Sequence, residues 1–426
     1  MAANIFDTMA HKIEFWRSDM STFLKESGDT KVSDVSISQV MGGMRGVTSL
    51  WCDTSVVPKE QGLIIRGKPV KDLTGLNAVQ VFYLLLTGDI PTDEEYHEFS
   101  VCLKIRKFVP YYVWEILKAM PKDSHPMTML STAVLAMQKE SAFAHHYEDG
   151  INKSEYWRYT LEDALNIIAK LPAIAAAIYR LRYEKGELIQ PDPDMRLTED
   201  FVHMLGLDAS GEDFLKLMKL FLVAHSDHEG GNVSSFTSAI VNSALSDLYY
   251  SISAGFNGLA GPLHGLANQE ALKWILDVMK RYNGTPSKAQ IEELVNETLA
   301  AGQVIPGYGH AVLRVVDPRF EAFYEFGKLH CPEDPVFKTV VHTFEVVPEI
   351  LKAIPKIQNP WPNVDAVTGS LLHHYGLREF SYYTVIFALS RSIGLASQAV
   401  MNRALGTPIV RPKSVTTSWL KSQVIK

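Results

Sequence analysis

The segment 304–319, Val-Ile-Pro-Gly-Tyr-Gly-His-Ala-Val-Leu-Arg-Val-Val-Asp-Pro-Arg, combines a turn with groups that could bind an anion. The Pro-Gly-Tyr-Gly run at 306–309 predicts a tight turn, because glycine and proline both disfavour a helix interior. His310 ends this turn, and Arg314 and Arg319 follow four and nine residues later. An imidazole and two permanent cations on so short a segment suit a polyanionic small molecule. The alternative is a structural turn with a capped histidine and surface arginines.

A second polar segment, Ala-His-Ser-Asp-His-Glu-Gly-Gly-Asn at 224–232, follows an apolar helical pattern. His225, Asp227, His228 and Glu229 could suggest a metal site, but the His-Glu-x-x-His spacing is absent and a third ligand is not obvious. Two other interpretations are favoured. The segment is a helix end with polar caps, or its histidines donate hydrogen bonds to a carboxylate.

His264 lies in the turn Gly-Pro-Leu-His-Gly at 261–265, ahead of a predicted helix. A neutral imidazole in a cleft could hydrogen-bond a carbonyl oxygen as negative charge develops there, and a helix N-terminus favours the uncharged ring. The alternative is a histidine that caps the helix or fills space.

Asp365 lies among apolar residues in Trp-Pro-Asn-Val-Asp-Ala-Val at 361–367. A carboxylate in apolar surroundings is partly desolvated and becomes a stronger base. An aspartate that caps the following helix is the alternative.

Arg391 lies on a predicted helix, and its neighbours on the same face are apolar: Phe387, Ala388, Gly394 and Leu395. A guanidinium on such a face needs a partner, because burying a lone charge is costly. No acidic residue lies at helical spacing, so we expect an anion from elsewhere in the protein or from a ligand, unless the side chain reaches solvent.

The elements that must position these residues are mainly helices. The pattern predicts a polar amphipathic helix over 5–28, and strands over 47–52 and 62–66 around a turn at Pro58. From about residue 77 the chain reads as helical almost throughout. Glycine or proline breaks are expected at 172, 255–265 and 355–362, and the 255–265 and 359–365 segments could bracket a second domain. The predicted helices carry apolar residues at helical spacing around 82–86, 161–178, 214–225, 272–279 and 379–405.

The bulk properties exclude some classes of protein. The chain has 426 residues, enough for two domains, and a formal net charge of −7, so nucleic-acid binding is not expected. Its three scattered cysteines fit free thiols in a reducing compartment. No apolar run is expected to reach membrane length, since the longest, near 171–179, contains a proline. The acidic N-terminal stretch resembles neither a signal peptide nor an intact mitochondrial transit peptide.

Taken together, these segments resemble the citrate synthase family, in particular its dimeric, mitochondrial-type members. The resemblance runs from about residue 37 to 414, and the matching pieces follow the family's order. They are Gly-Gly-Met-Arg-Gly (42–46), His-Ser-Asp-His-Glu-Gly-Gly-Asn-Val-Ser (225–234), Gly-Leu-Ala-Gly-Pro-Leu-His-Gly-Leu-Ala-Asn-Gln-Glu (258–270), Pro-Gly-Tyr-Gly-His-Ala-Val-Leu-Arg (306–314), Asp-Pro-Arg (317–319), Asn-Pro-Trp-Pro-Asn-Val-Asp-Ala (359–366) and Arg-Pro-Lys-Ser (411–414).

The resemblance implies a role for each candidate residue. Asp365 is expected to remove a methyl proton from acetyl-CoA while His264 hydrogen-bonds the thioester oxygen. His310 is expected to polarise the keto carbonyl of oxaloacetate, which the resulting carbon attacks before citryl-CoA is hydrolysed to citrate and CoA. The oxaloacetate or citrate site is expected to comprise His228, His310, Arg319, Arg391 and, from the other subunit of a homodimer, Arg411.

The resemblance also implies a CoA site. It assigns the phosphates to Arg45, Arg314 and the partner's Lys153, and the adenine to the backbone between Val304 and Gly309, including Ile305 and Gly307. Lys153 departs from the family, which often has arginine there, and a lysine offers a point charge and not a fork. Val367 and the pair His373-His374 near Asp365 also differ from the expected pattern.

The implied fold is mainly α, with a small N-terminal β hairpin. A large dimer-forming domain would comprise 1–265 and 377–426, and a mobile small domain, 266–376, would close over the site and exclude water. The implied enzyme is an acyltransferase of the tricarboxylic acid cycle without metal or cofactor. It would be cytoplasmic in a bacterium, or in the mitochondrial matrix of a eukaryote after transit-peptide removal. No membrane partner is expected.

Three alternatives remain open from the sequence. A 2-methylcitrate synthase would use propionyl-CoA with the same groups, and one methyl group is worth only about 1–3 kcal/mol in a pocket. A metal-dependent hydrolase would use His225, Asp227 and His228. A non-catalytic scaffold would release no thiol from acetyl-CoA and oxaloacetate.

Overall fold

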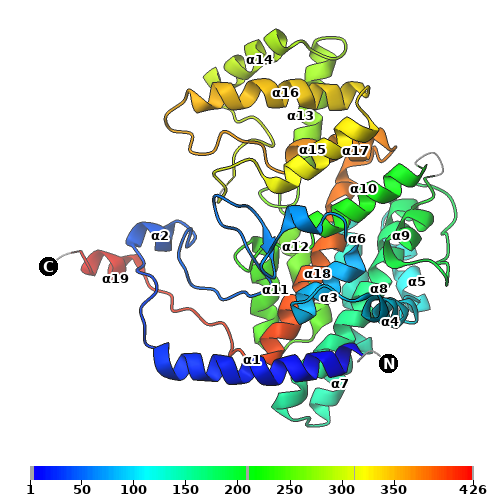
Figure 1. Cartoon of the computed structure of the whole chain (residues 1–426), viewed down its shortest axis with the longest axis vertical. Helices are drawn as coiled ribbons and strands as arrows, with labels where there is room; N and C mark the ends of the chain where they lie inside the picture. Colours follow the sequence, from blue (N-terminus) through cyan, green and yellow to red (C-terminus); the bar gives the residue numbers. More distant parts are fainter. Residues whose placement is uncertain (1–3, 208–210, 311, 425–426) are drawn as a thin grey trace.

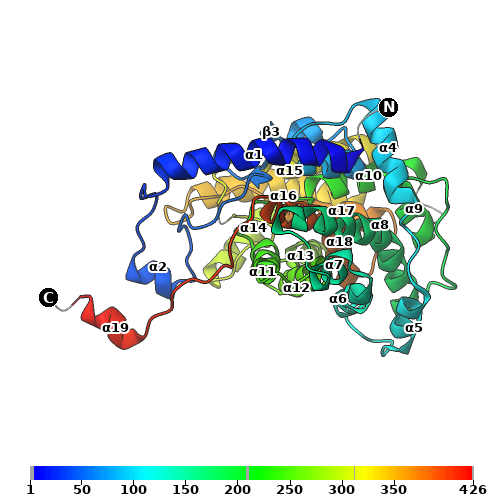
Figure 2. The ribbon, with the colours of Figure 1, turned by 90° about the horizontal axis from the view of Figure 1, so that it is seen from below.

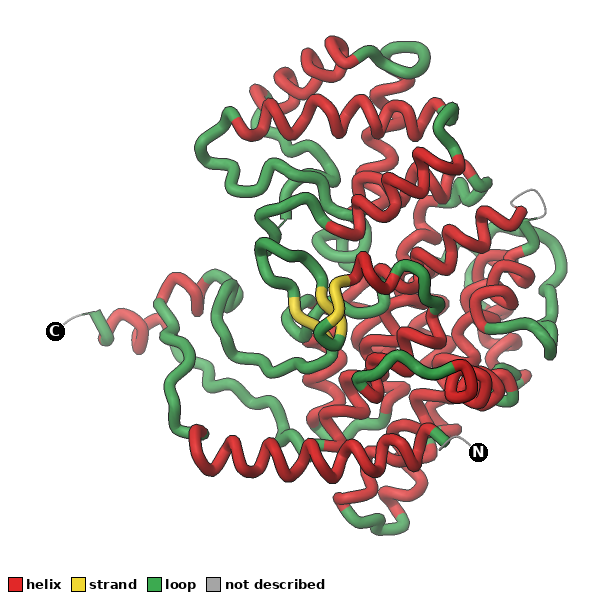
Figure 3. Tube along the Cα trace, in the orientation of Figure 1, coloured by secondary structure: helices red, strands yellow, loops and turns green. Residues whose placement is uncertain are grey.

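The protein is mainly helical, with strands confined to one small patch (Figure 3). A computed structural model describes residues 4–207, 211–310 and 312–424. The predicted mainly α fold is therefore confirmed. The N-terminal elements are α1 (Ile5–Ser27), α2 (Ile37–Met41), β1 (Ser55–Val56), β2 (Ile64–Ile65), β3 (Lys68–Pro69) and the 3-10 helix η1 (Val70–Leu73).

The predicted first helix is confirmed in α1. Asn4 caps it by accepting from the backbone N–H groups of Phe6 and Asp7. Ile5, Met9 and Ile13 recur every four residues, so only one stripe of its first half is buried.

The predicted small N-terminal β hairpin is confirmed, but its first strand lies later in the chain than expected and a third strand joins it. Residues 47–52 form no strand; the first strand is β1, which pairs antiparallel with β2, and β2 pairs in turn with β3. The prediction of a strand over 62–66 is confirmed by β2. The β-branched pattern at 47–52 was misleading because most of that stretch is exposed and it pairs with no strand in the described residues.

The larger body is built around two long helices, α8 and α18, with the others packed about them (Figure 1). Its elements are α3 (Ala78–Thr87), α4 (Asp93–Lys104), α5 (Tyr111–Ala119), α6 (Pro126–Ala136), η2 (Met137–Glu140), α7 (Ala142–Glu148), η3 (Lys153–Glu155), α8 (Tyr156–Arg182), α9 (Leu197–Leu205), α10 (Gly211–Ala224), α11 (Val233–Ser243), α12 (Leu248–Leu259), η4 (Phe380–Tyr382) and α18 (Tyr383–Ala404).

The predicted break at Pro172 is wrong, and the predicted break over 255–265 begins later, after α12 ends at Leu259. Helix α8 runs through Pro172, which is buried among apolar residues whose packing offsets the lost hydrogen bond. Helix α12 runs through Gly255 and Gly258, where glycine permits close packing. A Cβ atom at Gly255 would lie 2.8 Å from Leu395 of α18, and one at Gly258 would lie 3.2 Å from Val233 of α11.

The expectation that no apolar run reaches membrane length is wrong when helices are judged by their length and composition alone. Two helical stretches, Lys153–Arg182 and Phe380–Ala404, are long and apolar enough to cross a membrane. However, 78% and 94% of their most apolar windows are buried inside the protein. This burial is typical of the core helices of a folded body.

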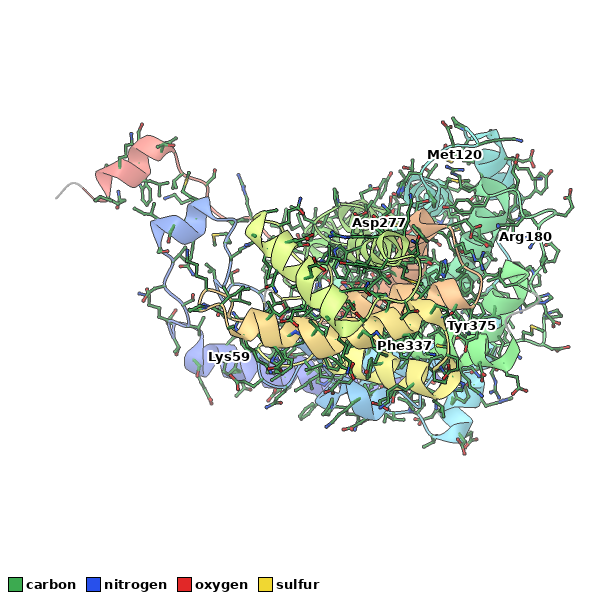
Figure 4. All side chains as sticks on the ribbon, turned by 90° about the horizontal axis from the view of Figure 1, so that it is seen from above. Lys59, Met120, Arg180, Asp277, Phe337 and Tyr375 are labelled. Atoms are coloured by element: carbon green, nitrogen blue, oxygen red, sulfur yellow. The ribbon has the colours of Figure 1, made fainter. Side chains whose placement is uncertain are left out.

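A second group of helices lies above the larger body in Figure 1. It has a small hydrophobic cluster of its own, formed by Ile291, Val295, Ile305, Val347 and Leu351. Figure 4 looks down on this group, with Phe337 of α16 and Tyr375 at the end of α17 labelled. Its helices are α13 (Ala267–Arg281), α14 (Lys288–Ala300), α15 (Pro318–His330), α16 (Pro335–Lys352) and α17 (Asp365–His374).

Two terminal segments extend away from the body. The chain between α1 and β1 carries α2, and the chain after α18 carries α19 (Thr417–Ser422); both views place these helices side by side (Figures 1 and 2). Both segments expose large apolar side chains, including Ile37, Met41, Ile409 and Trp419.

Candidate active site

The segment 226–232, between α10 and α11, places His228 beside Arg391 of α18. Arg391 is buried and donates from Nε to the carbonyl oxygen of His225 (3.1 Å) and from its Nη1 to Asn232 Oδ1 (3.2 Å). Asn232 also caps α11 and donates from Nδ2 to the carbonyl oxygen of His228 (2.7 Å). One asparagine therefore joins the histidine, the arginine and the start of a helix.

Arg391 has no carboxylate among these hydrogen-bond partners. Its acceptors are a carbonyl, an amide and, at 3.4 Å, the hydroxyl of Ser234, and its guanidinium lies 4.9 Å from the Phe387 ring centroid. Burial lowers the pKa of Arg391 to about 10. Its hydrogen-bond partners are neutral, and the nearby carboxylate of Asp227 opposes the lowering of its pKa, so the protein supplies part of its counter-charge without a direct ion pair.

His264 lies in the turn between α12 and α13, as predicted. Its Nε2 accepts from the backbone N–H of Ser234 (3.3 Å) and lies 3.0 Å from the Ser234 hydroxyl oxygen. A backbone N–H can only donate, so the proton of the neutral ring belongs on Nδ1. Desolvation, aided by the charge of Arg391, lowers the pKa of His264 to about 4. The ring is therefore neutral at pH 7 with one free donor.

His310 follows the predicted turn, in which Gly307 and Gly309 have φ of 81° and 87°. Its Nδ1 accepts from the backbone N–H groups of Val312 and Leu313, each at 3.0 Å. The proton of the neutral ring therefore belongs on Nε2. Desolvation and the charge of Arg319 lower the pKa of His310 to about 4.

A short antiparallel pairing joins the His310 turn to the segment before Asp365. Tyr308 forms a β-bridge with Pro362, Gly309 N–H donates to the Trp361 carbonyl (2.9 Å), and Asn363 N–H donates to the Gly307 carbonyl (2.9 Å). Asp365 is the first residue of α17, where apolar side chains such as Val364 and Ala366 are buried. Sequence segments 52 to 56 residues apart are thus fixed against each other.

Asp365 and Arg319 are electrostatic neighbours. Burial raises the pKa of Asp365 to about 6, although the cation of Arg319 opposes this shift. Arg319, itself 5% exposed, holds the fully buried Asp317 through Nε (3.0 Å) and Nη2 (2.7 Å). These two hydrogen bonds to Asp317 fix the orientation of the Arg319 guanidinium.

The predicted site residues of the two bodies meet at this point. The rings of His228 and His310 lie 5.8 Å apart, and Arg319 and Arg391 both lower the pKa of His228, after desolvation. His264 and Arg391 both lie against Phe387, at 6.3 Å and 4.9 Å from its ring centroid. The arrangement combines one basic carboxylate, neutral imidazole donors and two buried guanidinium groups.

Other predicted residues lie apart from this cluster within one chain. Arg411 is exposed on the C-terminal segment, Arg45 in the turn after α2, and Lys153 in η3. Arg314 is half-buried beside the His310 turn, with Nη2 donating to Gln358 (3.0 Å). In the turn itself Val304 is exposed and Ile305 buried.

The candidate metal ligands in segment 225–229 already contact other groups of the protein. The His225 ring stacks on Phe221 (4.1 Å between centroids) and its Nδ1 contacts the Phe221 carbonyl oxygen. Both carboxylate oxygens of Asp227 accept hydrogen bonds from protein side chains. Among residues 4–207, 211–310 and 312–424, no group of three His, Cys, Asp or Glu could hold a metal ion.

Three residues of the site were not predicted from the sequence: Asn232, Ser234 and Asp317. All three belong to the motifs quoted above, so motif membership was the available signal. Their roles depend on hydrogen bonds across the fold, which spacing along the chain does not reveal.

Residues 43–413 match the family model described as "Citrate synthase, C-terminal domain". The mitochondrial citrate synthase of Daucus carota is 46% identical over 411 residues, covering 94% of this chain and 87% of that protein. The peroxisomal citrate synthase of Saccharomyces cerevisiae is 46% identical over 416 residues, covering 95% and 90%.

Solved structures agree. Citrate synthase from Pyrobaculum aerophilum superposes with a TM-score of 0.79 at 27% identity, covering 91% of this chain and 95% of that one. The Thermoplasma acidophilum enzyme, solved as a ternary complex with carboxymethyl coenzyme A and oxaloacetate, gives 0.76 at 24% identity, covering 91% and 97%; this likeness supports the fold.

Proposed function

The chain belongs to the citrate synthase family, and from that premise we propose how its own residues condense acetyl-CoA with oxaloacetate. The family's enzymes are acyltransferases, and the reaction is the first step of the tricarboxylic acid cycle. The observation that carries the proposal is that buried Arg319 is the charge neighbour both of Asp365, a carboxylate with a raised pKa, and of His228, whose ring lies 5.8 Å from that of His310.

Oxaloacetate binds first, held by cations. Arg319 and Arg391 pair with its carboxylates, and His228 and the Nε2–H of His310 hydrogen-bond its polar atoms. Arg391 supports this step because its hydrogen-bond partners are neutral and only the more distant charge of Asp227 opposes its own, so its guanidinium can still pair directly with a substrate carboxylate. The partner's Arg411 also binds an oxaloacetate carboxylate.

Asp365 then takes a proton from the methyl group of acetyl-CoA. A thioester methyl is many pKa units less acidic than a carboxylic acid, at about 1.4 kcal/mol per unit, so the base alone is insufficient. His264 donates from Nδ1 to the thioester oxygen and stabilises the enolate as it forms. The neutral state of His264 and the raised pKa of Asp365 both support these roles.

The methyl carbon next attacks the keto carbon of oxaloacetate. A carbon–carbon bond forms, and His310 donates its Nε2 proton to the developing alkoxide, giving citryl-CoA; release of the methyl proton from Asp365 and uptake of one proton by His310 restore both groups. Water then adds to the thioester carbon, the carbon–sulfur bond breaks, and the thiol of CoA leaves with a proton. The products are citrate and CoA.

CoA binding extends the site along the His310 turn. Arg45, Arg314 and the partner's Lys153 neutralise its phosphates, and the backbone of Val304, Ile305, Gly307 and Gly309 contacts the adenine. The exposed Val304 and the positive φ of both glycines support close approach of a ligand to this backbone.

Two domains and a dimer assemble the site. A small domain, 266–376, closes on a large domain, 1–265 and 377–426, after oxaloacetate binds. A separate hydrophobic cluster around Ile291 and Val347 gives the outer part of the small domain packing of its own, whereas its helices α13, α15 and α17 contribute to the main core. The exposed apolar residues on the α2 and α19 segments support a homodimer in which these segments wrap the partner.

Acetyl-CoA is the proposed acyl donor, since each relative reported above is named a citrate synthase and not a 2-methylcitrate synthase. The mitochondrial relatives favour the matrix as the compartment. No cofactor enters the proposed steps, so activity should survive exhaustive chelation.

Release of free thiol tests the proposal. Mixing the protein with acetyl-CoA and oxaloacetate should give thiol and citrate together, and replacing acetyl-CoA by propionyl-CoA should give a lower kcat/KM. A protein that releases no thiol when both substrates are present is not a citrate synthase.

A further inference from the structure

Two buried side chains from distant elements hold the residues on either side of His228. Ser55 Oγ, on β1, donates to Asp227 Oδ2 (2.9 Å) and accepts from the backbone N–H of Glu229 (2.7 Å). Gln398 Nε2, on α18, donates to Asp227 Oδ1 (2.7 Å) and to the Glu229 carbonyl oxygen (3.3 Å). The preceding carboxylate and the following peptide groups are therefore bound by the same two side chains.

The backbone after His228 needs such support. Glu229 has a φ of 54°, in the left-handed region that residues with a side chain seldom adopt because the Cβ atom crowds the following carbonyl oxygen. Asp227 is fully buried, and a buried carboxylate is stable only when donors surround it. A Cβ atom at Gly394 would approach Asp227 Oδ1 to 2.6 Å, so the segment is pressed against α18.

The position of His228 depends on these contacts because its neighbours along the chain are fixed on both sides. Asn232 adds a third bond, to the carbonyl oxygen of His228 itself. The histidine ring then faces His310 at 5.8 Å, where the substrate is proposed to bind. A shift of the backbone at 227–229 would turn the ring away.

We propose that Ser55 and Gln398 are positioning residues for oxaloacetate binding, acting through His228. The inference rests on the proposed role of His228 as an oxaloacetate ligand. It extends the functional site to the small sheet near the N-terminus, which carries none of the proposed substrate-binding residues. Neither side chain needs to touch the substrate.

A double-mutant cycle tests this inference in the full-length enzyme. Ser55→Ala should raise the KM and the calorimetric Kd for oxaloacetate about tenfold, because it removes both hydrogen bonds by which Ser55 holds Asp227 and Glu229. The KM for acetyl-CoA should change little. In a His228→Ala background, Ser55→Ala should have no further effect on the oxaloacetate Kd.

Thr87→Val is the matched control. Thr87 is also buried, and its hydroxyl accepts from the backbone N–H of Asp89 (3.1 Å) and donates to the Tyr83 carbonyl (2.9 Å), but it lies at the end of α3. Both variants should lower the melting temperature similarly, and only Ser55→Ala should weaken oxaloacetate binding. Equal kinetic effects of the two variants would overturn the inference.

The cycle separates two kinds of failure. If His228→Ala leaves the oxaloacetate Kd unchanged, the proposed role of His228 fails and the inference fails with it. If His228→Ala weakens binding and Ser55→Ala weakens it equally in both backgrounds, only the inference is overturned. Gln398→Met, which keeps the side-chain length and removes the donor, repeats the cycle should Ser55→Ala not fold.

Discussion

Gly307 lies so close to Ala366 that a Cβ atom on the glycine would approach the Ala366 Cα and Cβ atoms to 2.8 Å. This contact joins the turn before His310 to the first turn of α17, where Asp365 lies. The relative position of the proposed base and the proposed carbonyl-polarising imidazole therefore depends on the absence of one methyl group.

Gly307→Ala should separate the two segments and lower kcat. Overpacking of this kind typically costs about 1–3 kcal/mol, in addition to the cost of positive φ. Gly302→Ala is the matched control, because Gly302 also has positive φ (73°) but no atom within 4 Å of its built Cβ. Thermal melting and thiol release should show both variants destabilised and only Gly307→Ala strongly impaired in turnover.

Asp365→Asn should abolish removal of the methyl proton from acetyl-CoA while leaving oxaloacetate binding intact. We expect a loss in kcat of about 10²–10⁴-fold, the usual contribution of a general base, with the calorimetric Kd for oxaloacetate changed little. Thiol release measures the first quantity. Wild-type turnover by this variant would dismiss Asp365 as the base.

The acid limb of the rate should follow Asp365. Because burial raises its pKa to about 6, the fraction of enzyme with a basic carboxylate falls as pH drops through that value. The kcat/KM for acetyl-CoA should therefore fall tenfold per pH unit below about 6. The pKa of His264 is lowered to about 4, so its charging should add to the loss only at lower pH.

The same shift makes a stability prediction. A carboxyl whose pKa is raised in the folded state favours the folded state most below its unfolded pKa, near 3.9, and this contribution is lost as pH rises through about 6. Asp365→Asn should therefore melt higher than the wild type at pH 8, and the difference should shrink towards pH 4. A gap that is constant with pH would contradict this linkage.

Arg391→Met should prevent oxaloacetate binding without destabilising the apoprotein. The variant removes a buried cation whose hydrogen-bond partners are neutral, but it also removes a favourable interaction with the buried carboxylate of Asp227, so the apoprotein should melt at a similar temperature. Oxaloacetate raises the melting temperature of the wild type by binding the folded state, and that increase should disappear in Arg391→Met. Scanning calorimetry with and without oxaloacetate measures both effects.

Arg411 should complement a defective partner. Asp365→Asn and Arg411→Ala homodimers should each be nearly inactive. If Arg411 acts across the dimer, a mixed dimer carries one doubly altered site and one intact site. Co-expression should then restore about one quarter of wild-type activity, since about half of random dimers are mixed. No recovery above the parents would assign Arg411 to its own subunit.

The sequence by itself determined the helices with strong periodicity and the chemistry of the site. Helix α1, helix α10 and the long helix α18 follow from apolar residues at helical spacing, because each buries one stripe or face whatever its neighbours are. Motif residues such as His264, His310 and Asp365 were identified from local context, since turn and helix-start residues carry local signals.

Only the tertiary structure decided which helices continue through a proline or glycine and which distant residues come into contact. Packing overrode local signals at Pro172 and Gly255, where neighbouring helices support the backbone, and the stretch at 47–52 found no strand partner. Ser55 reaches Asp227 across 172 residues of sequence, and Gln398 reaches it across 171. Contacts of that range leave no periodic trace in a single sequence, because they depend on how whole helices pack.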